Sequence, residues 1–356
     1  MLATLSSNVV LAKARTMYGR RLTPENYKDL LKCQTVSEVA SYLKNRTDYS
    51  KVMAGIEETE IHRDQVEAKL RQKLQEDFAS LCRYEITVGE RFTPYFIRRW
   101  EIAQILEVVL FLNSGAAVPE NEEVSQMPQS FLEKTNLDPK KLDHAANFDE
   151  LLSVLARTPY GKLLEPFKPK EKERIDYTRI EIALYGFLYE TIFEIILKNT
   201  HGETKSQLLE IFTSFIDLSN YVRIVRLKMS YHIDPEVIKE SLLPYGSINQ
   251  KIIDEMAAAK SEEEIDAAMN RTAIGRKISR EKSSYVDEIP RRYNFRVCQH
   301  DLHFSTHPSV VLIAYVFARE AEISDIITIV EGIRYKLEPS EIKKLLTIVN
   351  YMEGSG

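Results

Sequence analysis

Side chains that can bind metal ions gather in one short stretch, CQHDLHFSTHPS at 298–309. The donors in this stretch are Cys298, His300, Asp301, His303 and His307. On a helix the three histidines would share one face, where imidazoles could bind Zn²⁺ or Fe²⁺. Pro308 disfavours a helical conformation at His307, so such a helix should stop before its third ligand. We therefore expect no metal ion, no other cofactor and an ordinary junction between a helix and a loop.

A pair of carboxylates one helical turn apart, Glu190 and Glu194, is the second place where chemistry is conceivable. Paired carboxylates can serve in acid–base catalysis, but on an apolar helix they more often bond to neighbouring helices. The phosphate-binding motifs G-x-x-x-x-G-K-(S/T) and G-x-G-x-x-G do not occur, and neither do G-x-S-x-G and H-E-x-x-H. We predict no catalytic residue, no bound nucleotide and no small-molecule substrate.

The charge balance argues against nucleic acid as a partner. The 356 residues include 48 Lys and Arg against 53 Asp and Glu, a net charge of −5, whereas nucleic-acid binding usually requires a basic surface. Three scattered cysteines, Cys33, Cys82 and Cys298, favour a reducing compartment over a disulfide framework. The first residues lack the order of a signal peptide. We expect the chain to remain in the cytosol.

The segment IEIALYGFLYETIFEIIL, residues 180–197, approaches the length of a membrane-spanning helix. It contains Glu181, Glu190 and Glu194. An acidic residue at the centre of a bilayer costs roughly 2.5–3.5 kcal/mol. The segment is therefore predicted to be a helix buried by other helices.

Helical periodicity recurs along the chain and predicts an all-α fold. Residues 57–82, 206–229 and 308–335 place apolar residues at the spacing of one helix face. No long alternation of apolar and polar residues indicates a strand, and 12 glycines are few for a turn-rich β architecture. The segment 113–147 contains three prolines and many small or polar residues, so we expect a connector there.

An Arg-Thr pair occurs three times, in NRTDYSK at 45–51, ARTPYGK at 156–162 and NRTAIGRK at 270–277. The pairs are Arg46 and Thr47, Arg157 and Thr158, and Arg271 and Thr272. Their arginines stand 111 and 114 residues apart. A glutamate precedes each pair at a similar distance; these are Glu38, Glu150 and Glu264.

A second repeated element is a helix start with an apolar residue, a polar residue and then proline. It reads LTPENYKD at 22, LDPKKLDH at 137, IDPEVIKE at 233 and LEPSEIKK at 337. Together the two elements predict three helical repeats of about a hundred residues in a compact, pseudo-threefold body. The expected divisions are 1–130 with a leading helix, 131–232, and 233–356.

Two interpretations of the Arg-Thr pairs remain open. Three arginines at equivalent places could grip an acidic partner on the axis of the body. Alternatively, each arginine interacts with the dipole at a helix C-terminus, and the threonine forms the turn that follows. A separate basic stretch in this acidic chain is a candidate contact for an acidic partner surface. It consists of Arg276, Lys277, Arg280, Lys282, Arg291, Arg292 and Arg296.

Two segments carry a family resemblance, NYVRIVRLKMSY at 220–231 and THPSVVLIAYVFAREAEISDIITIVEGIRYKLEPSEIKKLL at 306–346. The most specific residues are Ala314, Tyr315, Arg319, Glu320, Ala321, Glu322, Ile323, Asp325 and Ile326. With them the chain resembles the C subunit of the archaeal and bacterial A-type (V-type) rotary ATPases, a relative of the d subunit of the eukaryotic V-ATPase. Asp325 stands where asparagine is frequent in that family.

The resemblance implies a funnel-shaped, all-helical protein without enzyme activity. A protein of this kind caps the membrane rotor ring on its cytoplasmic side and receives the central stalk, so that ATP turnover is coupled to transport of protons or sodium ions. The implied partners are the rotor ring and the central-stalk subunits, with the chain peripheral on the cytoplasmic face of the membrane. Two alternatives stay open: a metal-dependent hydrolase that uses the His300, His303 and His307 cluster, and a free-standing helical scaffold.

Overall fold

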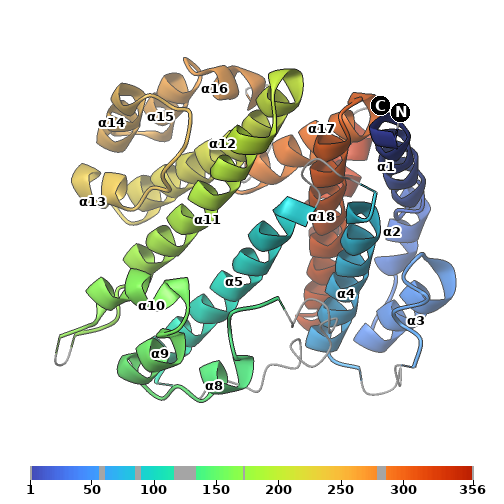
Figure 1. Cartoon of the computed structure of the whole chain (residues 1–356), viewed down its shortest axis with the longest axis horizontal. Helices are drawn as coiled ribbons and strands as arrows, with labels where there is room; N and C mark the ends of the chain where they lie inside the picture. Colours follow the sequence, from blue (N-terminus) through green and yellow to red (C-terminus); the bar gives the residue numbers. More distant parts are fainter. Residues whose placement is uncertain are drawn as a thin grey trace.

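Every regular element in the described part of the chain is a helix, which confirms the predicted all-α class (Figure 1). The structure is a computed structural model, and it describes residues 2–55, 61–84, 90–115, 134–170, 173–278 and 286–354. Within these ranges there is no β-strand.

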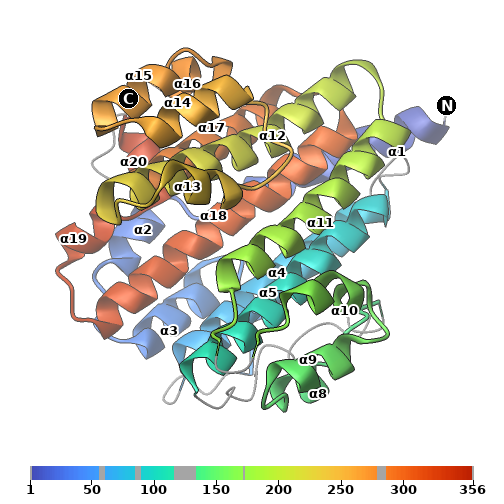
Figure 2. The same cartoon turned by 90° about the vertical axis from the view of Figure 1, so that its left-hand side faces the viewer.

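Long helices form the centre of the body and lie roughly along one direction (Figure 2). They are α1 (Leu2–Tyr18), α4 (Arg63–Cys82), α5 (Thr93–Ser114), α11 (Tyr177–Asn199), α12 (Gly202–Val225), α17 (Glu288–Phe304) and α18 (Pro308–Arg334). The predicted helices at 180–197, 206–229 and 308–335 correspond to α11, α12 and α18. A π-helical turn, Arg226–Ser230, extends α12. The helix predicted at 57–82 begins at Arg63, and residues 56–60 lie outside the described ranges.

The helix α18 is the central element of the packing. Helices α1, α4 and α17 pack against it, while α5 packs against α11 and α12 packs against α17. Consecutive helices α4 and α5 therefore have different neighbours. They touch at Phe78 and Phe96, whose ring centroids lie 4.5 Å apart, and Figure 1 shows them diverging from each other.

Short helices form three groups, which lie at different corners of the body (Figure 1). The groups are α2 (Pro24–Leu30) with α3 (Val36–Arg46); α8 (Pro139–Asp143), α9 (Phe148–Leu155) and α10 (Pro159–Leu164); and α13 (Pro235–Glu240), α14 (Gln250–Ala258), α15 (Glu262–Met269) and α16 (Ala273–Ile278). Near the C-terminus follow α19 (Pro339–Lys344) and α20 (Thr347–Gly354). Two short 3₁₀ turns, Glu90–Phe92 and Glu165–Phe167, complete the described elements.

The four predicted helix starts are confirmed, because α2, α8, α13 and α19 each begin with proline. Proline suits this position because its missing N–H would have no partner within the helix. Thr23 and Asp138 cap α2 and α8 with their side chains. At α13 and α19 the residue before the proline makes no side-chain cap bond.

The three glutamates noted before the Arg-Thr pairs take part in the N-terminal capping of α3, α9 and α15. Each stands three residues after an N-cap whose side chain accepts the glutamate N–H; the caps are Thr35, Asn147 and Ser261. Each glutamate carboxylate accepts the N–H of the residue before the cap, at 2.7, 2.9 and 2.7 Å respectively. These reciprocal bonds satisfy backbone donors that a helix start leaves open.

The three threonines of the Arg-Thr pairs form the same local bond after these helices. The Oγ1 atoms of Thr47, Thr158 and Thr272 donate to the carbonyls of Leu43, Leu155 and Met269, at 2.6, 2.8 and 2.7 Å. Each Oγ1 also accepts a backbone N–H two or three residues later. The three arginines are exposed beside these turns. The local geometry therefore gives the threonines a structural role, and the arginines lie on the surface.

The turns also explain the glycine found three residues after the threonine in two of the three motifs. A Cβ atom at Gly161 would lie 2.7 Å from the carbonyl oxygen of Leu155. At Gly275 it would lie only 1.9 Å from that of Met269. The helices α10 and α16 begin so close to the preceding helix that a side chain cannot fit there.

The apolar segment at 180–197 is packed within the protein. In α11 the buried residues Ile180, Leu184, Leu188, Ile192 and Ile196 repeat every four residues. None of the described helices has the length and apolar character needed to cross a membrane. In the predicted connector, α5 ends at Gly115, whose φ of 68° is left-handed. Residues 116–133 lie outside the described ranges, and α8 occupies part of the rest, which ends at Asn147, the N-cap of α9.

Candidate functional site

The histidine-rich stretch does not assemble its donors around one point. His300 Nδ1 lies 3.3 Å from Asp301 Oδ1, and His303 Nδ1 lies 2.7 Å from the Gln299 carbonyl oxygen. Helix α17 ends at Phe304, and His307 stands at the N-cap of α18 with its Nε2 3.4 Å from Glu203. The predicted interruption of the helix is therefore confirmed. In the described ranges no three His, Cys, Asp or Glu side chains are placed to share a metal ion.

The expectation that Glu190 and Glu194 bond to neighbouring helices is wrong. Both are exposed on the outer face of α11. Glu194 pairs with Lys198 of the same helix at 2.9 Å. Their spacing of four residues places both side chains on the same solvent-exposed face of α11.

Three buried carboxylates on the long helices bind backbone segments of the short-helix groups. Glu101 on α5, Asp217 on α12 and Glu322 on α18 are 0%, 2% and 1% exposed. Each accepts a backbone N–H: from Asn136 at 2.6 Å, from Ser247 at 2.8 Å and from Leu22 at 2.8 Å, respectively. A buried carboxylate is costly unless it is hydrogen-bonded. Each carboxylate therefore fixes one short-helix group on one long helix: Glu322 and Glu101 bind the segments before α2 and α8, and Asp217 binds the loop between α13 and α14.

Two of these carboxylates also bind a tyrosine from an Arg-Thr turn. Tyr49 donates its hydroxyl to Glu322 at 2.8 Å, and Tyr160 donates to Glu101 at 2.5 Å. Desolvation in these sites raises the pKa of both tyrosine hydroxyls, and the adjacent carboxylates raise it further. Both tyrosines thus remain protonated donors. In the third turn Ile274 stands in place of the tyrosine, and Ser247 Oγ donates to Asp217 at 2.5 Å.

The residues of the α18 signature fill the centre of this polar network. Arg319 is 1% exposed and pairs with Glu322 at 2.7 Å, while its guanidinium lies 5.0 Å from the centre of the Tyr49 ring. Tyr315 donates to Asp77 on α4 at 2.6 Å. The two carboxylate oxygens of Glu320 each accept a hydrogen bond from Arg99 on α5, both at 2.9 Å. The signature therefore joins α18 to α3, α4 and α5.

Asp325 extends the network to the C-terminal helix. Its two oxygens accept the backbone N–H groups of Thr347 and Ile348, each at 2.8 Å, at the start of α20. Burial raises the pKa of Asp325 to about 7, against the lowering effect of those two hydrogen bonds. Asn220 makes a similar link on α12, where its side chain both donates to and accepts from the backbone of Leu243.

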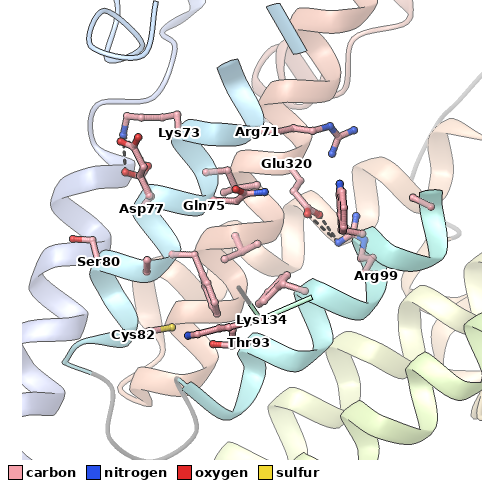
Figure 3. Close-up of a pocket in the computed structure, with 18 of the residues that line it drawn as sticks. Arg71, Lys73, Gln75, Asp77, Ser80, Cys82, Thr93, Arg99, Lys134 and Glu320 are labelled. Atoms are coloured by element: carbon pink, nitrogen blue, oxygen red, sulfur yellow. Dashed lines mark hydrogen bonds and ion pairs between the residues drawn. The ribbon is translucent and has the colours of Figure 1, made fainter. Parts of the chain in front are cut away.

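A cleft of about 1210 Å³ opens where α4 and α5 diverge (Figure 3). Its walls come from both helices, with Val316 and Glu320 of α18 and Tyr185 of α11. Aromatic residues Phe78, Phe96 and Trp100 line part of it. Figure 3 shows Lys73 and Asp77 on the α4 side and Arg99 beside Glu320 on the other. The cleft thus lies directly against the polar network of α18.

The cleft carries more basic than acidic residues, although the chain is acidic overall. The basic residues are Arg20, Lys51, Arg71, Lys73, Arg83, Arg99 and Lys134, and the acidic ones are Asp48, Glu76, Asp77, Glu107 and Glu320. Lys73 is neutralised by Asp77 at 2.7 Å and Asp48 at 3.1 Å. Arg83 and Lys134 are exposed. A partner segment that enters this cleft would meet an apolar wall and a basic rim.

The predicted basic stretch is divided between two helices, and part of its charge is already paired. Lys277 bonds to Glu210, and Arg292 pairs with Glu288 at 2.8 Å. Arg296 donates to the Lys277 carbonyl at 3.3 Å. Arg276 and Arg291 are exposed. Arg280 and Lys282 lie outside the described residues.

Sequence reasoning singles out two acids of this network, Glu322 and Asp325, but not the cleft. The family signature contains Glu322, and Asp325 stands out by its departure from the frequent asparagine. Nothing in the local sequence around Leu22 indicates that its N–H binds a residue 300 positions away. The only local signal is the recurrence of an acid followed by Ile or Leu at Glu101, Asp217 and Glu322.

Comparison with known proteins gives consistent matches along the chain. Residues 10–345 match the family described as ATP synthase (C/AC39) subunit. The C subunit of the A-type ATP synthase of Pyrococcus furiosus is 22% identical over 345 residues, which cover 94% of this chain and 88% of that protein. The protein of the same name from Haloquadratum walsbyi is 22% identical over 352 residues, covering 94% and 96%. The one from Methanosphaera stadtmanae is 24% identical over 221 residues, covering 61% and 53%.

We predict that Asp325→Asn changes how stability depends on pH. Because the folded-state pKa of Asp325 is raised, its stabilising contribution is complete below about pH 4 and is lost as the pH rises towards 7. Asparagine cannot ionise, so the variant should gain stability relative to wild type by about 1–3 kcal/mol between pH 5 and pH 7. Urea unfolding of both proteins over this range measures the difference. Parallel pH curves for the two proteins would contradict it.

Proposed function

Because the chain belongs to the ATP synthase (C/AC39) subunit family, we propose that it is a non-catalytic part of a rotary A-type ATPase that couples the membrane rotor ring to the central stalk. The observation that carries this proposal is the family match over residues 10–345. In this role the chain sits on the cytoplasmic face of the membrane as a peripheral subunit. It binds the ring at one side and the stalk at another, and it transmits rotation that drives, or is driven by, transport of protons or sodium ions.

The proposal includes a pseudo-threefold, funnel-shaped body with repeats divided at 1–130, 131–232 and 233–356. Support comes from the threonine turns at Thr47, Thr158 and Thr272, which share one bonding pattern. Further support comes from the buried acids Glu101, Asp217 and Glu322, each of which binds a backbone N–H of one short-helix group or of the segment before it. A body built from similar units encloses an axial hollow, which suits a part that joins two coaxial partners.

We assign the cleft between α4 and α5 to the central stalk. Its volume of about 1210 Å³ is above the roughly 300–1,000 Å³ typical of small-molecule sites. Phe78, Phe96 and Trp100 offer apolar contact, while Arg83 and Lys134 are exposed at its edge. Such a combination suits an amphipathic helix of a partner that also carries acidic residues.

We predict that removal of this protein uncouples the complex. ATP hydrolysis by the soluble head should continue, because the head contains its own catalytic sites, whereas ATP-driven ion transport should be lost. The measurement is ATPase activity beside ion uptake in reconstituted vesicles, with and without added wild-type protein. Undiminished transport in the depleted complex would favour a free-standing scaffold, and a hydrolytic activity of the isolated chain that follows its metal content would favour the hydrolase.

A second prediction tests the cleft. Ala103 is exposed on α5 and lines the cleft, so Ala103→Trp should obstruct it without disturbing the core. We expect stalk binding to weaken by about tenfold or more, equivalent to roughly 1.4 kcal/mol, with an unchanged thermal midpoint. Ala267→Trp, at an exposed position on α15 outside the cleft, is the matched control. Equal binding by the two variants would place the stalk elsewhere.

The basic stretch remains the proposed electrostatic contact, with Arg276, Lys277 and Arg291 as its exposed members among the described residues. Arg276→Glu should weaken assembly with the partner subunits more at low than at high ionic strength, because exposed charges are screened over about 8 Å at physiological salt. The control is Lys162→Glu, the same charge reversal at an exposed position on α10. Co-purification at two salt concentrations measures the effect. Identical salt dependence of the two variants would remove Arg276 from the contact.

A further inference from the structure

The buried apolar residues of the described chain form two cores. They meet at Val297, which packs against both, and Leu243 from the loop after α13 packs against the larger one. The larger core includes residues of α1, α4, α5, α11 and α18. The smaller core joins the second half of α12, from Leu218 to Val225, to the group α13–α16 and to Tyr293. We name residues 231–278 the third lobe. Its contribution to the smaller core is Ile238, Met256, Ala257, Ala259, Ile265, Ala268, Met269, Ile274 and Ile278.

The third lobe packs its buried apolar residues mainly on one another and on the second half of α12. Three of its core residues are alanines, which gain little from burial. The other two groups contribute to the larger core, through residues such as Leu43 and Leu155. Parts of a protein with few buried apolar contacts open most readily. The division of the core therefore separates this lobe energetically from the rest of the body.

Two of the three non-glycine residues with positive φ in the described chain lie in the third lobe, and the other is Lys336. His232 and Tyr245 have positive φ values of 52° and 69° without being glycine, and they lie on either side of α13. The π-helical turn Arg226–Ser230 comes directly before them. Such conformations persist only where the surrounding contacts enforce them, and π-helical turns often mark functional positions. Opening of the lobe would relax both strained residues.

Several polar bonds fasten the third lobe to α12, including those of Asn220 with Leu243 and of Arg223 with the Ser241 carbonyl. Tyr221 donates its hydroxyl to Asp266 on α15 at 2.6 Å, and Ser247 binds Asp217 through its N–H and its hydroxyl. Lys277 bonds to Glu210, with both side chains about half exposed. The tyrosine–carboxylate bond that ties the other two groups to the acid of their long helix is absent here, because residue 274 is isoleucine.

We propose that the third lobe opens from α12 as one cooperative unit while the larger core stays intact. The helices α12 and α17 remain in place because they pack against each other and, on α12, Leu208, Ile211 and Phe212 belong to the larger core. Opening exposes the second half of α12, from Leu218 to Val225. The lobe is thus a conformational device that can move without breaking the central helices, and this inference does not depend on the proposed coupling function.

Hydrogen–deuterium exchange of the full-length chain, followed by mass spectrometry, tests the proposal. In the wild type we expect α14 and α15 to exchange together and at least tenfold faster than α4 and α18. Tyr221→Phe should speed exchange of α14 and α15 by about three- to tenfold, as loss of one hydrogen bond predicts, and leave α4 and α18 unchanged. Tyr160→Phe makes the same chemical change at Glu101 in the larger core, so it should leave the lobe unaffected.

Two results would overturn the proposal. One is a wild type in which the amides of α14, α15 and α18 exchange through a single opening with the same rate. The other is a Tyr221→Phe protein in which α4 and α18 accelerate as much as the lobe. Because the wild-type measurement needs no variant, the first outcome decides the question even if a variant fails to fold.

Discussion

The carboxylate of Glu322 is the interaction on which the arrangement of the long and short helices depends. It is almost completely buried, and moving an unpaired charge out of water costs several kcal/mol. Arg319, Tyr49 and the N–H of Leu22 supply the compensating bonds. These groups come from α18, from the turn after α3 and from the segment before α2. None of them can move far without leaving a buried charge unpaired.

A buried, hydrogen-bonded carboxylate also occurs on α5 and α12, but the side chains that donate to it differ. Glu101 binds a tyrosine hydroxyl and a backbone N–H, as Glu322 does, whereas Asp217 takes a serine hydroxyl and two N–H groups. The shorter aspartate brings the loop nearer: a Cβ atom at Gly246 would lie 2.4 Å from its Oδ1. One physical requirement, satisfaction of a buried acid, thus positions three groups of short helices and accounts for the polar residues of the α18 signature.

The sequence predicted those features that depend on neighbouring residues. Helix stripes, the prolines that begin four helices and the threonine turns are local, and the structure contains all of them. The cleft could not be predicted from the sequence. It arises because α4 packs against α18 while α5 packs against α11, so that the two helices separate. The exposed position of Glu190 was also missed. An apolar composition fixes how much of α11 is buried but not which of its faces is turned to water.

The bond between Leu22 and Glu322 has a consequence for how the protein is made. The two residues are separated by 300 positions, and a ribosome adds roughly 5–20 residues per second. The first short-helix group therefore leaves the ribosome many seconds before the helix that completes its polar contacts exists. During that interval α3 lacks its contacts with α18 and α2 lacks its contacts with α20, so the apolar faces of both helices stay exposed. Only when the last long helix emerges can the beginning of the chain reach its final structure.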